Sequence, residues 1–299
     1  MRTILRSYWN DAAWYQKFAY AVAALLIASG IFHAIVLLIT GGPWEGPLSW
    51  RKAISFGLSF GLTTLSLTWV THFLPKRRVL MGVLLTALGI AMFVEVFLTT
   101  MQVWRGVPSH FNFGTRFDAA VFVWMGIMIA VVGVVVLAIT VMSFRSLDAP
   151  RSLAWAIRAG LLFLIVGQAV GGLMIRNGNA KVFDPQTRQF VLARVAGTST
   201  YGEAGNMKSS HAVSLHAIQV LPVLAWLLTF THHSERTRAR LVLVATLGYL
   251  ALTAVAVAQT FSGRAPTQLP STLLLAAVSG AVLLLFSYGL AVRSLVARA

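Results

Sequence analysis

Long apolar runs separated by short polar segments dominate the pattern of this chain. Eight of them are long enough to cross about 30 Å of hydrocarbon, which takes roughly 20 helical residues. Each run is continuously apolar, so we expect helices and not the alternating strands of a barrel. The pattern therefore predicts an all-α, polytopic transmembrane helix bundle that forms a single transmembrane domain over residues 1–299. The predicted spans are 16–40, 50–73, 79–101, 117–142, 153–175, 209–231, 239–260 and 270–293.

Composition agrees with a protein whose partner is the lipid bilayer. Hydrophobic residues make up 58% of the 299 positions and 11% are charged, against roughly 25% charged residues in soluble domains. Mean hydropathy is +0.78. The chain has no cysteine, which excludes disulfides, thiolate metal sites and cysteine nucleophiles.

The formal net charge of +16 comes from cations that gather in alternate connections between the spans. This pattern follows the positive-inside rule, predicts that both termini are cytoplasmic and argues against a nucleic-acid partner. The 176–208 connection carries five cations on the predicted outer side, but long loops are weaker indicators of orientation than short ones. The cations on the cytoplasmic side are Arg2, Arg6, Lys17, Lys76, Arg77, Arg78, Arg145, Arg151, Arg236, Arg238, Arg240, Arg293 and Arg298.

Two connections have features of their own. The first fifteen residues contain Tyr8, Trp9, Trp14 and Tyr15, which is typical of a segment that lies among the headgroups. The long outer loop, 176–208, has Asp184 followed by proline between two short apolar stretches. This spacing predicts a turn that forms a hairpin or a lid.

Ionisable residues inside transmembrane spans are costly and therefore indicate a functional site. In this chain they are His33, Glu95, His211 and His216, with Lys52 at an edge. At about 1.5 Å of rise per residue, His33, Glu95 and His216 each lie roughly 10 Å below the predicted outer surface. We find no polar residues to line a path through the cytoplasmic half. The sequence therefore predicts a His/Glu site in the outer half of the bundle.

Other residues near this level are expected to support the site. His211 is turned about 140° away from His216 on an ideal helix, so we expect it to face the outer loops with His110. Pro222 frees a backbone carbonyl one turn earlier, which predicts a kink that opens space beside His216. The predicted supporting polar side chains are Gln102, Gln168, His211 and Gln219.

The first hypothesis is a redox protein that holds one haem b near the outer face and passes electrons to a redox partner there. Two imidazoles from facing helices, His33 and His216, would be its axial ligands. The haem propionates would pair with the arginines at this level, and Glu95 would relay a proton. The arginines are Arg51, Arg105 and Arg116.

Three alternatives stay open. A non-haem zinc or iron site would use His33, His216 and Glu95, joined by His110, in a metal-dependent membrane enzyme. Proton-coupled transport would use Glu95 as the proton-binding group, although we find no inverted repeat. The same buried polar residues can also be purely structural. Whether the protein is an enzyme is left open.

The segments WRKAISFG, RGVPSHFN and HAVSLHAIQVLP resemble those of an uncharacterised family of bacterial multipass membrane proteins. The resemblance implies an eight-span architecture in the bacterial cytoplasmic (inner) membrane and no established activity. That family's pattern has an Asp-Arg pair shortly before the histidines, where this chain reads GNMKSSH.

Overall fold

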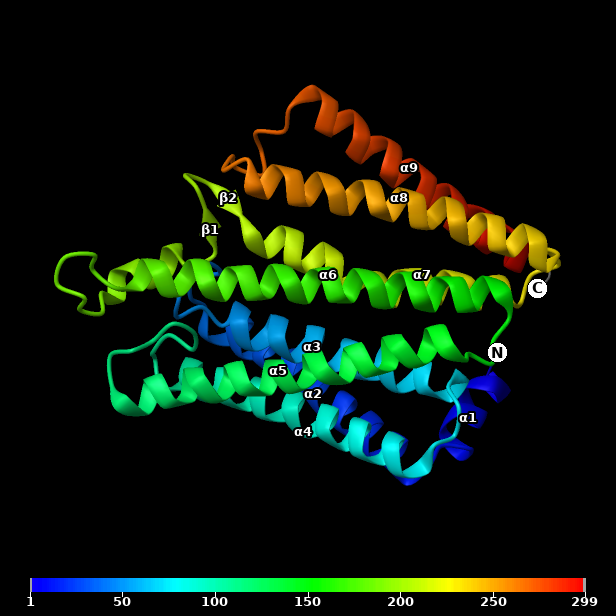
Figure 1. The fold of residues 1–299 in the computed structure, drawn as a ribbon, viewed down its shortest axis with the longest axis horizontal. Helices are drawn as coiled ribbons and strands as arrows, with labels where there is room; N and C mark the ends of the chain where they lie inside the picture. The colour runs from blue at the N-terminus through cyan, green and yellow to red at the C-terminus, as the bar shows by residue number, and fades with distance from the viewer. Residues whose placement is uncertain (1, 298–299) are drawn as a thin grey trace. The chain divides into compact units, whose positions relative to one another are not determined.

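The computed structural model describes residues 2–297 (Figure 1). Eight of its helices are long and apolar enough to cross a membrane, which confirms the predicted all-α polytopic bundle. They are α2 (Trp14–Thr40), α3 (Arg51–Val70, continued by the 3-10 turn η1, Thr71–Phe73), α4 (Arg78–Trp104), α5 (Arg116–Arg145), α6 (Arg151–Val182), α7 (Met207–Leu228), α8 (Glu235–Phe261) and α9 (Ser271–Val296). The short elements are α1 (Arg2–Asn10), η2 (Leu192–Gly197) and the antiparallel strands β1 (Thr200–Tyr201) and β2 (Gly205–Asn206).

The contacts within the chain group it into two compact units, whereas the sequence pattern indicates one transmembrane domain. Unit 1 comprises Met1–Ile139 and Arg176–Thr198, and unit 2 comprises Thr140–Ile175 and Ser199–Ala299. Helices α5 and α6 each contribute to both units.

The core of unit 1 is built on a very close approach of α2 and α3. A Cβ added at Gly57 would lie 2.6 Å from the backbone nitrogen of Gly30. One turn on, a Cβ at Gly61 would lie 2.9 Å from the carbonyl oxygen of Ala23. Only glycine allows two helix backbones to come this close. Gly57 and Gly61, four residues apart, therefore serve the packing of α2 against α3.

In unit 2, tyrosines of α8 and α9 bond to the backbone of α7. The hydroxyl of Tyr249 donates to the carbonyl oxygen of Val213 at 2.7 Å. That of Tyr288 donates to the carbonyl oxygen of Val220 at 2.6 Å. Helix α7 continues through Pro222. The bond to Val220 lies within the turn where the proline removes a hydrogen-bond donor, and the bond to Val213 lies about one turn before it.

Helix α6 ends seven residues later than predicted, at Val182 instead of residue 175. The extension is polar, but its last residue is fully buried in a cluster with Phe111, Phe122 and Val195 of unit 1. Tertiary packing therefore extends the helix beyond its apolar run. At the end of the helix, Asp184 Oδ1 accepts from two backbone N–H groups at 2.9 Å, and Phe183 forms an antiparallel bridge with Phe190. The predicted turn at Asp184 is confirmed, and its role as a lid stays a prediction.

Candidate functional site

One face of α4 carries three buried polar side chains toward its C-terminal end. Glu95, Thr99 and Gln102 are exposed by 1%, 0% and 0%, and their spacing of four and three residues places them on one side of the helix. Within the described residues, Glu95 Oε2 and Thr99 Oγ1 have no hydrogen-bond partner. Buried polar atoms are nearly always paired, so this stretch of α4 stands out.

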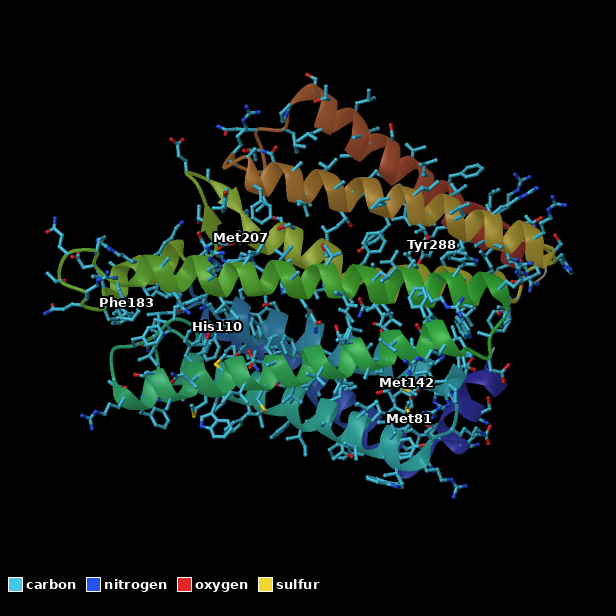
Figure 2. All side chains as sticks on the ribbon, viewed as in Figure 1. Met81, His110, Met142, Phe183, Met207 and Tyr288 are labelled. Atoms are coloured by element: carbon cyan, nitrogen blue, oxygen red, sulfur yellow. The ribbon has the colours of Figure 1, made fainter. Side chains whose placement is uncertain are left out.

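His110, in the connection between α4 and α5, lies against Glu95. Its Nε2 is 3.8 Å from Glu95 Oε1, which is beyond hydrogen-bond distance. Its Nδ1 lies 2.9 Å from the hydroxyl oxygen of Ser109, and its ring meets that of Phe56 edge-on. Burial, with a smaller contribution from the positive charge of Lys52, lowers the pKa of His110 well below its ordinary value. The imidazole is therefore neutral at pH 7. Figure 2 shows His110 in unit 1, toward the end where Phe183 also lies.

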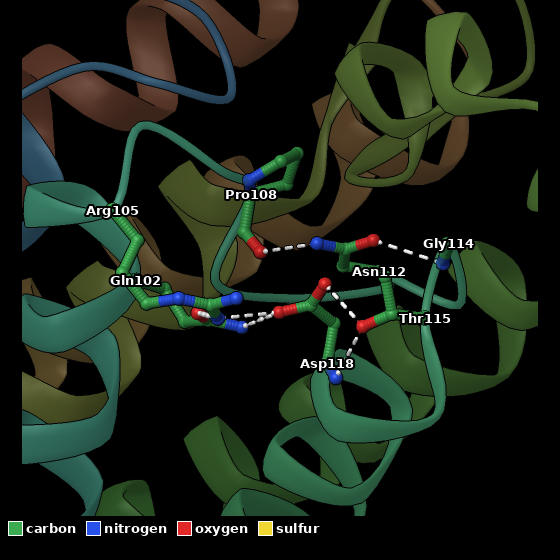
Figure 3. Close-up of polar contacts among 7 residues, drawn as sticks. All are labelled: Gln102, Arg105, Pro108, Asn112, Gly114, Thr115 and Asp118. Carbon is green, nitrogen blue, oxygen red and sulfur yellow. Dashed lines mark hydrogen bonds and ion pairs between the residues drawn. The ribbon is translucent and has the colours of Figure 1, made fainter.

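An ion pair between the buried Asp118 and the partly exposed Arg105 closes the connection that carries His110 (Figure 3). Asp118, at the start of α5 and 3% exposed, accepts from Arg105 Nη1 at 2.6 Å. It also accepts from Gln102 Nε2 at 2.9 Å and from the Thr115 hydroxyl at 2.7 Å. Arg105 further donates to Gln102 Oε1. We call these four residues the Asp118 clamp, and they join the end of α4 to the beginning of α5.

Local contacts also fix the segment between Arg105 and Asp118. Asn112 donates to the carbonyl oxygen of Pro108 at 3.3 Å and accepts from Gly114 N at 3.1 Å. Phe111 has a φ of +57°, a conformation that L-residues rarely adopt. Its ring lies against Gly178, where an added Cβ would be 2.3 Å from Phe111 Cε1. A segment held at so many points keeps the neighbouring His110 in one place.

His33, the first predicted haem ligand, is 3% exposed and both of its ring nitrogens have partners. Nδ1 lies 2.7 Å from the carbonyl oxygen of Ser29. Nε2 accepts the indole hydrogen of Trp104 at 3.0 Å, and the ring stacks against Trp50 with centroids 6.0 Å apart. The depth of His33 along its helix does not reveal that two tryptophans surround its ring.

His216, the second predicted ligand, belongs to unit 2, where its Nδ1 lies 3.3 Å from Gln219 Oε1. Gln219, one of the predicted supporting side chains, therefore lies on the same face of α7 as His216. His211 differs from the expectation that it faces the outer loops, because its Nδ1 lies 2.7 Å from the carbonyl oxygen of Gly167 on α6. A Cβ at Gly171 would lie 3.0 Å from the same ring. Gln168, also on α6, is partly buried.

The predicted metal and propionate roles stay predictions. Among the described residues, no group of three or more His, Asp or Glu side chains is arranged to hold a metal ion. Arg51 bonds to Glu45 at 3.2 Å and to the carbonyl oxygen of Trp44 at 3.0 Å. Arg105 belongs to the Asp118 clamp, whereas Arg116 is exposed. That His33 and His216 share one haem iron is likewise a prediction.

From the sequence we expect no polar residues to line the predicted cytoplasmic half of the bundle, and the structure corrects this for unit 1. Thr64, Thr68 and Thr71 follow one another along α3 and η1 and are exposed by 0%, 0% and 6%. Each hydroxyl donates to a backbone carbonyl of the preceding turn, and Thr71 Oγ1 accepts from buried Gln16 at 3.0 Å. Threonine has little effect on hydropathy, so the sequence pattern hides this row. Only its spacing of four and three residues could have revealed it.

Sequence reasoning also missed Arg158, an arginine inside the apolar run of α6. Its Nε donates to the carbonyl oxygen of Ser143 at 3.0 Å, and its guanidinium lies over the ring of Phe144 at 5.5 Å. The side chain therefore caps the C-terminal end of α5, where a cation complements the helix dipole. This contact gives Arg158 a structural role.

No protein-family model, curated protein or solved structure matches this chain. The resemblance to a bacterial multipass family therefore stays a prediction.

Proposed function

We propose that this protein is a proton-coupled membrane protein in which Glu95 takes up and releases a proton and the neutral His110 accepts a hydrogen bond from its protonated form. One observation carries the proposal. Glu95 is 1% exposed, its Oε2 has no partner among the described residues, and its Oε1 lies 3.8 Å from a neutral imidazole. A buried, unpaired carboxyl in a membrane span is a functional-site hypothesis by default.

The chemistry follows from the cost of burying charge. An ionised carboxylate without a partner costs several kcal/mol in a protein interior, and a proton on Glu95 removes that cost. The neutral imidazole of His110 has one unprotonated nitrogen, which can accept a hydrogen bond from the protonated Glu95 carboxyl. A small side-chain rotation would bring the two groups from 3.8 Å to hydrogen-bond distance, where the imidazole stabilises the protonated form of Glu95. The adjacent Ser109 hydroxyl extends the chain of exchangeable groups by one member.

The buried threonines of unit 1 support proton coupling over a purely local role. Counted from the helix ends, Glu95 lies 9 residues before Trp104 and Thr64 lies 13 residues after Arg51. The difference of 4 residues corresponds to about one helical turn. Thr64, Thr68 and Thr71 thus continue the buried polar groups from the level of Glu95 toward the first turn of α2, where Gln16 lies.

The residue types Ser109, His110 and Glu95 also occur in acyl-transfer enzymes, but their arrangement argues against that chemistry. Ser109 is 0% exposed, and a nucleophile must reach a substrate carbonyl.

Infrared difference spectroscopy on the protein in lipid tests the proposal directly. Over a pH range in which exposed carboxyls remain ionised, we expect a protonated-carboxyl stretching band that appears and disappears with pH. Glu95→Gln should abolish the band. Glu45→Gln is the matched control, because its side chain is 75% exposed, and it should leave the band unchanged. A wild-type protein without the band, or a band that persists in Glu95→Gln, would rule out Glu95 as the proton carrier.

A further inference from the structure

The end of unit 1 opposite His110 is formed by α1, the first turn of α2 and the turn that joins η1 to α4. Tyr8 of α1 packs its ring against His72 and Trp69, with centroids 5.3 and 6.1 Å apart. These contacts hold α1 beside the turn, as Figure 1 shows. With nine residues, α1 is far too short to cross a bilayer. We call this the α1 end.

Cations prevail at the α1 end, where one acid, Asp11, accompanies Arg2 and five further cations. Three of these five are consecutive and exposed where the turn after η1 enters α4. Among the described residues, no carboxylate lies within ion-pair distance of any of the five. These five cations are Arg6, Lys17, Lys76, Arg77 and Arg78.

Two exposed tryptophans accompany these cations. Trp9 is 51% exposed and Trp14 is 67% exposed, although burial of a large aromatic ring stabilises a protein in water. Indole rings prefer the headgroup level of a bilayer, where their apolar body and polar N–H are both satisfied. Exposed indoles beside unpaired cations are therefore suited to a surface that is both apolar and anionic.

The basic turn of unit 2 differs from the α1 end in this respect. There Arg238 donates to the carbonyl oxygen of Thr231 at 2.8 Å and lies 3.9 Å from Glu235. The same turn presents Arg236 and Arg240 as exposed cations. It offers a matched comparison, because its exposed cations lie on α8, which contains no tryptophan.

We infer that the α1 end is a binding surface for the headgroups of anionic phospholipids. The phosphates would contact Lys76, Arg77 and Arg78, and the indoles of Trp9 and Trp14 would lie between headgroups and acyl chains. Each cation near an anionic surface strengthens binding roughly fivefold, and salt screens the effect. This inference is independent of proton exchange at Glu95.

Native mass spectrometry of the full chain in neutral detergent tests the inference. Phosphatidylglycerol is titrated against phosphatidylcholine with the same acyl chains. We expect preferential retention of phosphatidylglycerol, weakened on the order of tenfold or more by K76Q/R77Q/R78Q and unchanged in the control R236Q/R240Q. The single variant R77Q, with a loss of roughly fivefold, serves if the triple variant does not fold. Wild-type retention by the variants, or an equal loss in the control, would show that the α1 end has no special affinity for anionic lipid.

Discussion

Trp104 donates its indole hydrogen to Nε2 of His33 at 3.0 Å, and Nδ1 of the same ring lies 2.7 Å from the carbonyl oxygen of Ser29. These two contacts together fix the tautomer of the His33 imidazole, with the proton on Nδ1. Iron needs a nitrogen lone pair of the imidazole. Haem ligation by His33 therefore requires that the bond from Trp104 breaks.

Trp104→Phe releases His33 Nε2 and tests the haem hypothesis. If haem b binds at His33, the variant should take up more haem than the wild type during haem-replete expression, read from the Soret absorbance per protein. Trp124→Phe is the control, because this residue is 56% exposed. Colourless wild-type and variant proteins would exclude haem ligation at this histidine.

Asp118→Asn should destabilise unit 1. The substitution removes the negative charge that Arg105, Gln102 and Thr115 surround, and Arg105 is 39% exposed, which limits the loss. We expect a decrease of about 2 kcal/mol in the free energy of unfolding, measured as a lower midpoint of thermal unfolding by tryptophan fluorescence. Asp148→Asn, at an exposed position, should leave the midpoint unchanged. Equal midpoints for both variants would mean that the clamp does not stabilise the fold.

The depressed pKa of His110 predicts a pH dependence of stability. Burial lowers its pKa in the folded state, so between that value and the unfolded value of about 6.5 the unfolded chain binds more protons. Stability from this group is complete above pH 6.5 and falls as the pH decreases, by at most about 1.4 kcal/mol per pH unit. Thermal midpoints measured from pH 8 to pH 5 should show the fall in the wild type and a smaller fall in His110→Gln. The same fall in both proteins would assign the effect to other groups.

Gly57→Ala should separate α2 from α3. The new Cβ would lie 2.6 Å from Gly30 N and 2.7 Å from Gly30 Cα, and backbone atoms cannot move aside as a side chain can. We expect a loss of about 1–3 kcal/mol or more in the free energy of unfolding. Gly126→Ala is the matched control on another span, because nothing lies within 4 Å of its added Cβ, and it should be neutral or slightly stabilising. The measurement is the thermal midpoint of each variant, and a Gly57→Ala protein as stable as the Gly126→Ala control would contradict the close packing.

The helices could be predicted from the sequence because burial in lipid imposes a continuous apolar run on each span. Helix ends that depend on tertiary packing could not. Helix α6 reaches Val182 because that residue fills a space beside Phe111 and Phe122, and no local signal encodes it. The strands β1 and β2 could not be predicted either. Each has two residues, which is too short to show an alternating pattern.

The residues of the candidate site could be predicted from the sequence, but which of them lie next to one another could not. Glu95 and His110 could be named from the sequence, because charged and polar residues are rare near membrane spans. Equal depth matched Glu95 with His33 and His216, since depth is the one coordinate that residue counting supplies. Rotation of α4 and the path of its following loop decide instead that Glu95 meets His110, and both depend on contacts such as that between Arg105 and Asp118.

The close contact of α2 and α3 at Gly30 and Gly57 determines which parts of unit 1 can move. Two helices whose backbones touch have no side chains between them to rearrange, so they shift only together, as a fixed wall. We therefore expect access to Glu95 to depend on movement of α4, the helix that carries it. Any opening of unit 1 would then move its other helices relative to the fixed pair of α2 and α3.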